Sequence, residues 1–230
     1  MAPDSTPEAS TTHPAGGEPK WRRRPEARPE EILTAALQVF GEEGFARATL
    51  DRVAERAGVC KGTLYLYFDS KEELFRGMVR GKCGVVLAKA EERLRTFQGT
   101  ATEALELFIR SMWDEVRRTE MASLARLVHA ELGHFPELAR FYFDEVIVRT
   151  RSLMRGVLDR GIASGEFRPE ARAYAARAIP ALLVQGAMHQ RGFGCYDPEA
   201  ISDEELVEGV IDLVLHGVRN RPSEVPNSKD

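Results

Sequence analysis

The sequence has no long hydrophobic run. Its longest apolar stretch, residues 178–184, falls far short of the roughly 20 residues that a membrane-spanning helix needs. No apolar segment follows the first methionine, where a secretory signal would lie. We therefore expect a cytoplasmic protein that does not associate with membranes.

Cysteine is scarce, and no pattern of reactive or metal-binding residues replaces it. Cys60, Cys83 and Cys195 are far apart and form no Cys-x-x-Cys pair, which argues against a disulfide framework or a structural zinc site. His129 and His134 are five residues apart on an expected helix, so their rings would face different sides. The sequence also lacks a glycine-rich phosphate loop and a Ser-His-Asp order. It therefore predicts no metal site, no cofactor and no enzymatic activity.

Over the whole chain, basic side chains are fewer than acidic ones. The formal net charge is −4, which taken alone argues against a nucleic-acid partner. The distribution is uneven, because residues 20–82 carry 13 basic and 10 acidic side chains whereas residues 83–230 carry 19 basic and 23 acidic. The N-terminal part thus has a local positive charge of the kind that attracts phosphates.

No segment shows the period of two that is typical of β-strands, and helical periodicity dominates. We predict an all-α protein of about nine helices, with a three-helix helix-turn-helix domain at residues 29–75 and a larger helical bundle at residues 76–220. Residues 1–28 and 221–230 are predicted to be disordered tails because they lack periodic apolar residues. Glycine, proline and capping signals, including capping boxes that begin at Ser70, Thr100 and Ser202, delimit the helices. The expected ranges are 29–43, 49–57, 61–68, 70–97, 100–119, 121–132, 136–163, 170–192 and 202–219.

Residues 48–74 hold the most informative pattern. Two short helices are joined by a tight turn that contains Gly58, as a helix-turn-helix requires if its second helix is to enter the major groove of DNA. The second helix would expose groups that bind phosphates or the groove, at Lys61, Gly62, Thr63, Tyr65 and Tyr67. This pattern predicts double-stranded DNA as a partner.

The same stretch resembles the TetR family of bacterial transcriptional regulators. In that family the first helix ends in Gly-Phe or Gly-Tyr and is followed by T-x-x-x-[IV]-A-x-x-A-G-V-S-x-G-T-L-Y-x-Y-F-x-S-K-E-x-L. The resemblance covers about residues 29–80. The matching residues are Gly44, Phe45, Thr49, Val53, Ala54, Ala57, Gly58, Val59, Gly62, Thr63, Leu64, Tyr65, Tyr67, Phe68, Ser70, Lys71, Glu72 and Leu74.

The resemblance implies roles for individual residues at the DNA. Lys61, Gly62 and Thr63 would meet base edges at the start of the recognition helix. Tyr65, Tyr67 and Lys71 would touch phosphates or a thymine methyl group, and Thr49 would touch phosphate. Cys60 stands where the family usually has serine, and it is either a tolerated substitute, which we favour, or a redox switch.

A basic cluster precedes the first expected helix. Arg22, Arg23 and Arg24 lie within residues 20–28, which hold five basic side chains. They form either an arm that contacts DNA beside the main site or a solvated tail.

The larger bundle is rich in aromatic residues and methionine. Most of these side chains must form the core, but the resemblance also implies a pocket for a small hydrophobic or aromatic ligand. The candidate ligand-binding residues are Met112, Trp113, His129, Phe141, Tyr142 and Gln185.

The last two helices carry wide apolar faces. The resemblance implies a two-fold homodimer through these helices, and two recognition helices would read a palindrome where one reads too few base pairs. The candidate interface residues are Ala178, Leu182, Val207, Val210, Ile211, Val214, Leu215 and Val218.

Taken together, these features predict a sequence-specific DNA-binding transcriptional regulator, and the resemblance favours a repressor. It would bind a palindromic operator as a dimer, and a small-molecule ligand would release it by shifting the helix at residues 70–97. The main alternative is an architectural or partner-binding helix-turn-helix protein without an inducer. An enzyme that acts on small hydrophobic substrates would rest on the aromatic cluster alone.

Overall fold

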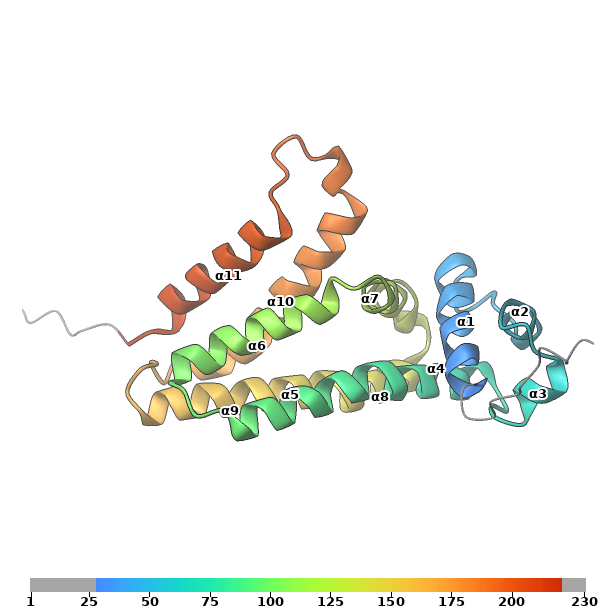
Figure 1. Cartoon of the computed structure of the whole chain (residues 1–230), viewed down its shortest axis with the longest axis horizontal. Coiled ribbons are helices and arrows are strands. Elements are labelled where there is room, and N and C mark those ends of the chain that lie inside the picture. Colours follow the sequence, from blue (N-terminus) through green and yellow to red (C-terminus); the bar gives the residue numbers. More distant parts are fainter. Residues whose placement is uncertain (1–27, 221–230) are drawn as a thin grey trace, which may run out of the picture.

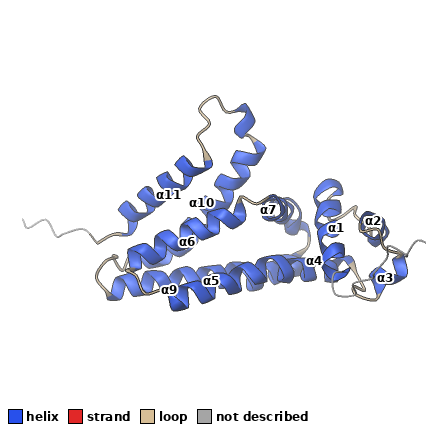
Figure 2. Cartoon of the chain, in the orientation of Figure 1, coloured by secondary structure: helices blue, strands red, loops and turns tan. Residues whose placement is uncertain are grey.

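The computed structural model describes residues 28–220, and these residues are almost entirely helical (Figure 2). Within this range there is no β-strand, only an isolated bridge between Phe167 and Arg219. The α-helices are α1 Arg28–Glu43, α2 Leu50–Arg56, α3 Lys61–Tyr65, α4 Lys71–Val79, α5 Val85–Thr96, α6 Ala101–Val116, α7 Thr119–Glu131, α8 Pro136–Tyr142, α9 Arg149–Ala163, α10 Ala171–Gly192 and α11 Asp203–Val218. The prediction of an all-α fold is confirmed.

Two of the predicted long helices contain a π-helical segment. Segment η2, Arg80–Gly84, joins α4 to α5, and segment η4, Phe143–Val148, joins α8 to α9. The two segments contact one another. When each joined run is taken as one helix, residues 28–220 form nine helices, the number that the sequence predicts. Two helix ends differ by three residues, because α3 ends at Tyr65 and not at Phe68, and α6 ends at Val116 and not at residue 119.

The helix ends follow the capping signals with one change. Thr100 and Ser202 form reciprocal capping boxes with Glu103 and Glu205. The Ser70 hydroxyl caps α4, but the carboxylate of Glu73 accepts from the amide of Asp69 instead of that of Ser70. The cap of α4 therefore satisfies the same number of amides through a neighbouring residue.

Two apolar cores lie along the molecule. The first joins α1–α4 with α7 and α8, and Phe45 at its centre is fully buried. The second joins α6, α9, α10 and α11. In Figure 1 helices α1–α3 form one end of the molecule, and the run α4–η2–α5 leads from them along the larger bundle. The small helices at that end thus share their core with helices of the larger bundle.

Helix α10, with 22 residues, is the longest α-helix in the part of the chain that the structure describes. No helix in residues 28–220 combines the length and the apolar character that crossing a bilayer requires.

Candidate nucleic-acid interface and ligand cavity

The exposed face of α3 carries the residues expected at DNA. Leu64 is fully buried and anchors the helix, whereas Tyr65 and Tyr67 are 43% and 40% exposed. Lys61 and Gly62 are exposed, and a Cβ atom built on Gly62 would meet no atom within 4 Å. Space around Gly62 therefore lets another molecule approach the backbone closely.

Leu66 is an exposed residue that the sequence analysis missed. It lies between the two tyrosines, directly after α3, and its side chain is 82% exposed. An apolar side chain in this position can contact a thymine methyl group. The spacing of the motif held no signal for it, because a leucine near a helix end is more often buried.

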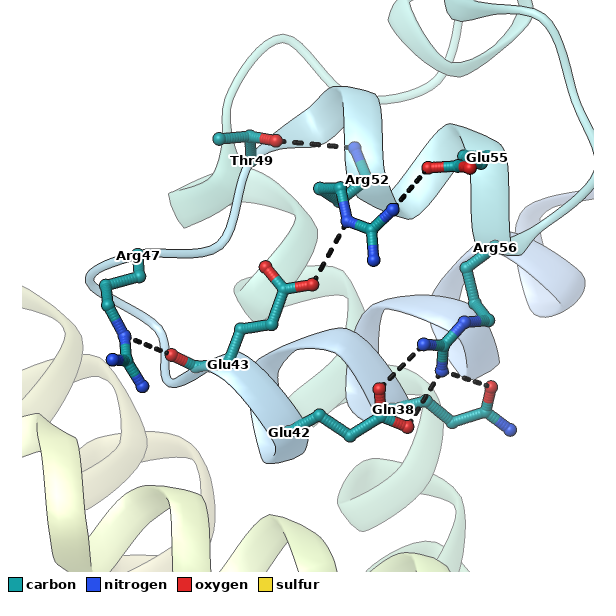
Figure 3. Close-up of polar contacts among 8 residues, drawn as sticks. All are labelled: Gln38, Glu42, Glu43, Arg47, Thr49, Arg52, Glu55 and Arg56. Carbon is teal, nitrogen blue, oxygen red and sulfur yellow. Dashed lines mark hydrogen bonds and ion pairs between the residues drawn. The ribbon is translucent and has the colours of Figure 1, made fainter.

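Helix α2 is fixed to α1 by ion pairs, as Figure 3 shows. Arg52 lies 3.1 Å from Glu43, and Arg56 lies 2.6 Å from Glu42. The hydrogen bond from Arg56 lowers the pKa of the Glu42 carboxyl. The hydroxyl of Thr49 accepts from the amide of Arg52 at 3.3 Å and so caps α2. These contacts hold α2 in place, and α2 in turn packs on α3.

At the start of α3, Lys61 forms an ion pair and the Cys60 thiol forms a hydrogen bond. The ammonium of Lys61 lies 2.7 Å from the carboxylate of Asp51, and this hydrogen bond raises the pKa of Lys61. The Sγ atom of Cys60 lies 3.0 Å from the Thr63 hydroxyl, and this hydrogen bond lowers the pKa of the thiol. The Lys61 ammonium must therefore leave the Asp51 carboxylate if it contacts DNA.

Lys71 stabilises the loop between α1 and α2. Its ammonium donates to the carbonyl groups of Phe45 at 3.0 Å and Ala46 at 2.9 Å and lies 4.9 Å from the centre of the Phe45 ring. Gly44 begins this loop with a φ of 80°, a conformation that favours glycine. Two of the three ammonium protons are used here, which leaves one for the phosphate contact that the sequence analysis assigns to Lys71.

A cavity of about 710 Å³ lies within the larger bundle. Its walls come from η2 and from α5 to α10 and are mainly apolar, and its size falls in the range of small-molecule sites. Cys83 in η2 and Tyr142 in α8 both line it, and burial raises the pKa of the Cys83 thiol to about 12 and also raises that of the Tyr142 phenol. Both groups are therefore protonated at neutral pH.

Four of the six predicted ligand-binding residues line this cavity, namely Met112, His129, Tyr142 and Gln185. Trp113 and Phe141 do not. Trp113 packs in the second core, and Phe141 packs in the first core beneath the guanidinium groups of Arg76 and Arg80. Helical periodicity shows that such side chains point inward, but not whether they meet a core or a cavity.

The predicted dimer residues divide into two groups. Ala178 and Leu182 are exposed on α10, and Val210 is half-buried. The other five are buried in the second core of the same chain: Val207, Ile211, Val214, Leu215 and Val218. The apolar stripe of α11 is thus occupied by contacts within the chain, whereas Leu213 on its other side is 64% exposed.

Two further expectations concern the arginines before α1 and a metal site. Arg22, Arg23 and Arg24 lie outside the described residues. Within residues 28–220, no three His, Cys, Asp or Glu side chains gather in a way that could hold a metal ion. His129 instead uses its Nδ1 atom in a 2.8 Å hydrogen bond with the carbonyl of Ala125.

The chain matches two known protein families along its length. Residues 32–78 match "Bacterial regulatory proteins, tetR family", and residues 103–217 match "AefR-like transcriptional repressor, C-terminal domain". The first match covers α1 to α4, and the second covers most of the larger bundle.

Curated and solved relatives agree with these matches. The chain is 27% identical over 196 residues to the Fatty acid metabolism regulator protein of Bacillus subtilis (strain 168), covering 83% of this chain and 95% of that protein. It is 30% identical over 145 residues to the HTH-type transcriptional repressor KstR2 of Rhodococcus jostii (strain RHA1), covering 62% of this chain and 69% of that protein. The crystal structure of the transcriptional regulator FadR from Bacillus subtilis in complex with stearoyl-CoA superimposes with a TM-score of 0.68 at 25% identity, over 83% of this chain and 99% of that chain.

Proposed function

Because the chain belongs to the TetR family of bacterial regulatory proteins and is a DNA-binding transcriptional regulator, we propose that it represses genes from a palindromic operator and is released by a small, largely apolar ligand. The observation that carries the proposal is that one continuous helical run, α4–η2–α5, packs on α1 at one end and lines the 710 Å³ cavity at the other. Its relatives are regulators and not enzymes, which agrees with the sequence prediction.

The DNA contacts in this proposal come from α3 and the residues around it. Lys61, Gly62 and Thr63 meet base edges, while Tyr65 and Tyr67 contact the phosphate backbone. Thr49 and Lys71 contact phosphates at the starts of α2 and α4. The exposure of α3 supports these roles, and so do the ion pairs that hold α2 against α1.

A two-fold dimer of this chain is part of the proposal. The exposed faces of α10 and α11 would form the contact, with Ala178 and Leu182 on one helix and Leu213 on the other. Placing charges on this face tests the contact. Leu182→Arg together with Leu213→Arg should give a monomer in sedimentation velocity. Phe193→Arg, at another exposed apolar residue, should leave a dimer. A dimer that persists in the double variant would contradict this face.

Ligand binding would act through the α4–η2–α5 run. A ligand that prefers one position of this helix changes the separation of the two recognition helices in the dimer. A tenfold loss of operator affinity needs about 1.4 kcal/mol of differential binding. The relative crystallised with stearoyl-CoA supports a ligand with a long apolar chain.

The first test is selection of bound duplexes from a random-sequence pool at two salt concentrations. Wild-type protein should recover an inverted repeat, and Tyr65→Ala should not. Tyr196→Ala, which removes an exposed tyrosine after α10, is the matched control and should recover the same repeat. Weak binding without a motif, equal in all three proteins, would favour the alternative of an architectural protein without an inducer.

A further inference from the structure

The cavity is apolar in its interior, but its walls carry an excess of positive charge. Four basic side chains line it: Lys89 and Arg93 on α5, Arg151 on α9 and Arg177 on α10. The single carboxylate in the lining belongs to Glu115, which lies 3.7 Å from Arg118. The charged groups that face the cavity are therefore mostly cationic.

None of these four cations forms an ion pair with another residue in the part of the chain that the structure describes. Arg93 donates only to the Ser111 hydroxyl at 3.4 Å, Arg177 donates to the carbonyl of Ala173 at 2.7 Å, and Arg151 lies 5.6 Å from the centre of the Phe143 ring. Arg95 on α5 and Arg149 on α9 behave differently.

The comparison along each helix makes the difference clear. On α5, Arg95 pairs with Glu92 at 2.7 Å, and on α9, Arg149 pairs with Glu91 at 2.9 Å. Neither of these paired residues lines the cavity. All four cations that line the cavity thus lack a carboxylate partner among the described residues.

The positions of the four cations favour a shared site at the edge of the cavity. Lys89 and Arg93 are four residues apart on one helix, so they lie on the same face. Helix α5 packs against α9, and α9 packs against α10. Lys89, Arg93 and Arg177 are exposed and Arg151 is half-buried, which puts their charged ends toward solvent and the apolar residues deeper.

We infer that the ligand of this cavity is an anionic amphiphile, whose apolar chain fills the interior and whose carboxylate or phosphate binds Lys89, Arg93, Arg151 and Arg177. The inference rests on the proposed function, since it names the ligand class of the same cavity. Arginine pairs with carboxylate and phosphate in a bidentate geometry, and a low-dielectric wall beside the charges strengthens that attraction. A neutral or cationic molecule of the same chain would leave the four charges uncompensated.

The test compares head groups on one chain length. Dodecanoate, dodecyl phosphate, lauroyl-CoA, dodecanol and dodecyltrimethylammonium are titrated into the full-length protein by calorimetry and tested for release of operator DNA. The anionic probes should bind at least tenfold more tightly than dodecanol, a difference of about 1.4 kcal/mol. The order of affinities among the three anionic probes shows whether the site prefers a carboxylate, a simple phosphate or a phosphate-bearing thioester as the head group.

Variants assign the head group to these residues. Arg93→Gln with Arg151→Gln should weaken the best anionic probe at least tenfold and change dodecanol binding less than twofold. Arg95→Gln is the matched control on α5 and should change neither. A double variant that weakens dodecanol as much as the anion would show a general loss of packing and overturn the head-group site.

The outcomes separate this inference from the proposed function. If dodecanol or the cationic probe binds best and releases the operator, the protein is ligand-responsive but the inference is wrong. If no probe binds and none releases the operator, both the head-group site and release by an apolar ligand fail.

Discussion

The carboxylate of Glu131, at the end of α7, accepts a hydrogen bond from the backbone amide of Ala46 at 3.3 Å across 85 residues of sequence. Ala46 lies in the loop that positions α2, whereas His129, two residues before Glu131, lines the cavity. The ring of Phe135 packs on Phe45 in the same loop, with the ring centres 4.8 Å apart. Helix α7 therefore gives the cavity a second contact with the DNA-binding helices, beside the α4–η2–α5 run.

Removing this contact should weaken operator binding. We expect Glu131→Ala to cost about 1 kcal/mol of binding, or roughly fivefold in operator affinity, because the Ala46 amide loses its acceptor and the loop loses a support. Glu131→Gln retains an acceptor oxygen and should stay close to wild type. The measurement is fluorescence anisotropy with the selected operator, with and without ligand.

The control for this prediction is Glu137→Ala, which removes an exposed carboxylate from neighbouring α8. It should leave operator affinity unchanged. Equal affinities for wild type and Glu131→Ala would show that the contact is dispensable for positioning the DNA-binding helices.

Breaking the ion pair between Asp51 and Lys61 should strengthen DNA binding. Asp51→Asn removes a negative charge beside α3 and frees the Lys61 ammonium for contact with DNA. Operator affinity should rise severalfold at low salt, and this gain should shrink as salt is added because salt screens the charge that the substitution removes. Asp114→Asn breaks an ion pair with Arg117 on α6 and serves as the control, because it lies in the larger bundle. An operator affinity that stays the same in Asp51→Asn would mean that the Lys61 ammonium does not contact DNA.

Glu166 should make folding stability depend on pH. Its carboxylate accepts hydrogen bonds from the amides of Ala101 at 3.1 Å and Thr102 at 2.9 Å and from the Ser164 hydroxyl at 2.8 Å. Burial acts to raise the pKa of Glu166, but these hydrogen bonds outweigh it and lower the pKa to about 2. The folded state thus favours the ionised form more than the unfolded state does.

The contribution of this carboxylate to stability is therefore present above the ordinary glutamate pKa of about 4.5 and is lost as the pH falls toward 2. Glu166→Gln should lower the free energy of unfolding by about 2 kcal/mol near neutral pH, and the gap to wild type should narrow below that pKa. Urea unfolding across this range measures the gap, and Glu170→Gln, an exposed neighbour, should show none. A gap that stays constant with pH would refute the role of the charge.

The three cysteines should differ in reactivity with iodoacetamide. Cys83 is buried and its pKa is about 12, so it should react only after unfolding. Cys60 and Cys195 are exposed, and Cys60 should react readily because the Thr63 hydroxyl lowers its pKa. Mass spectrometry of digests from native protein locates the adducts.

The same labelling tests the alternative roles of Cys60. In a Cys195→Ser background, an adduct on Cys60 adds bulk at the first residue before α3, and operator affinity should fall. Unchanged affinity after full labelling would leave the residue as a tolerated replacement for serine and exclude a redox switch.

Local signals in the sequence predicted the helices well, and contacts between distant residues account for what they missed. Thr100 and Ser202 cap helices as expected because a cap depends only on the next three residues. The π-helical segments η2 and η4 went unpredicted, since the same apolar periodicity continues through them. The support of Ala46 by Glu131 is likewise invisible in the sequence, because it joins residues that only the tertiary fold brings together.

The functional residues divide in a similar way. The exposure of Tyr65 and Tyr67 follows from a short, strongly patterned motif. In contrast, the helical periodicity at Trp113 and Val207 is the same whether the side chain faces a core, a cavity or a second subunit. Which of the three applies depends on the neighbouring helix, and a single sequence does not identify that neighbour.

The first apolar core has a consequence for engineering new sensors from this regulator. Phe45 and Phe75 share that core with side chains of α7 and α8, and Phe45 packs on Phe135 just before α8, so a chimera joined after α4 would place these rings against foreign residues. Such a hybrid would expose or mispack large aromatic rings and lose several kcal/mol of stability. Retargeting to a new promoter is therefore better achieved by replacing the exposed side chains of α3 than by exchanging the whole N-terminal module.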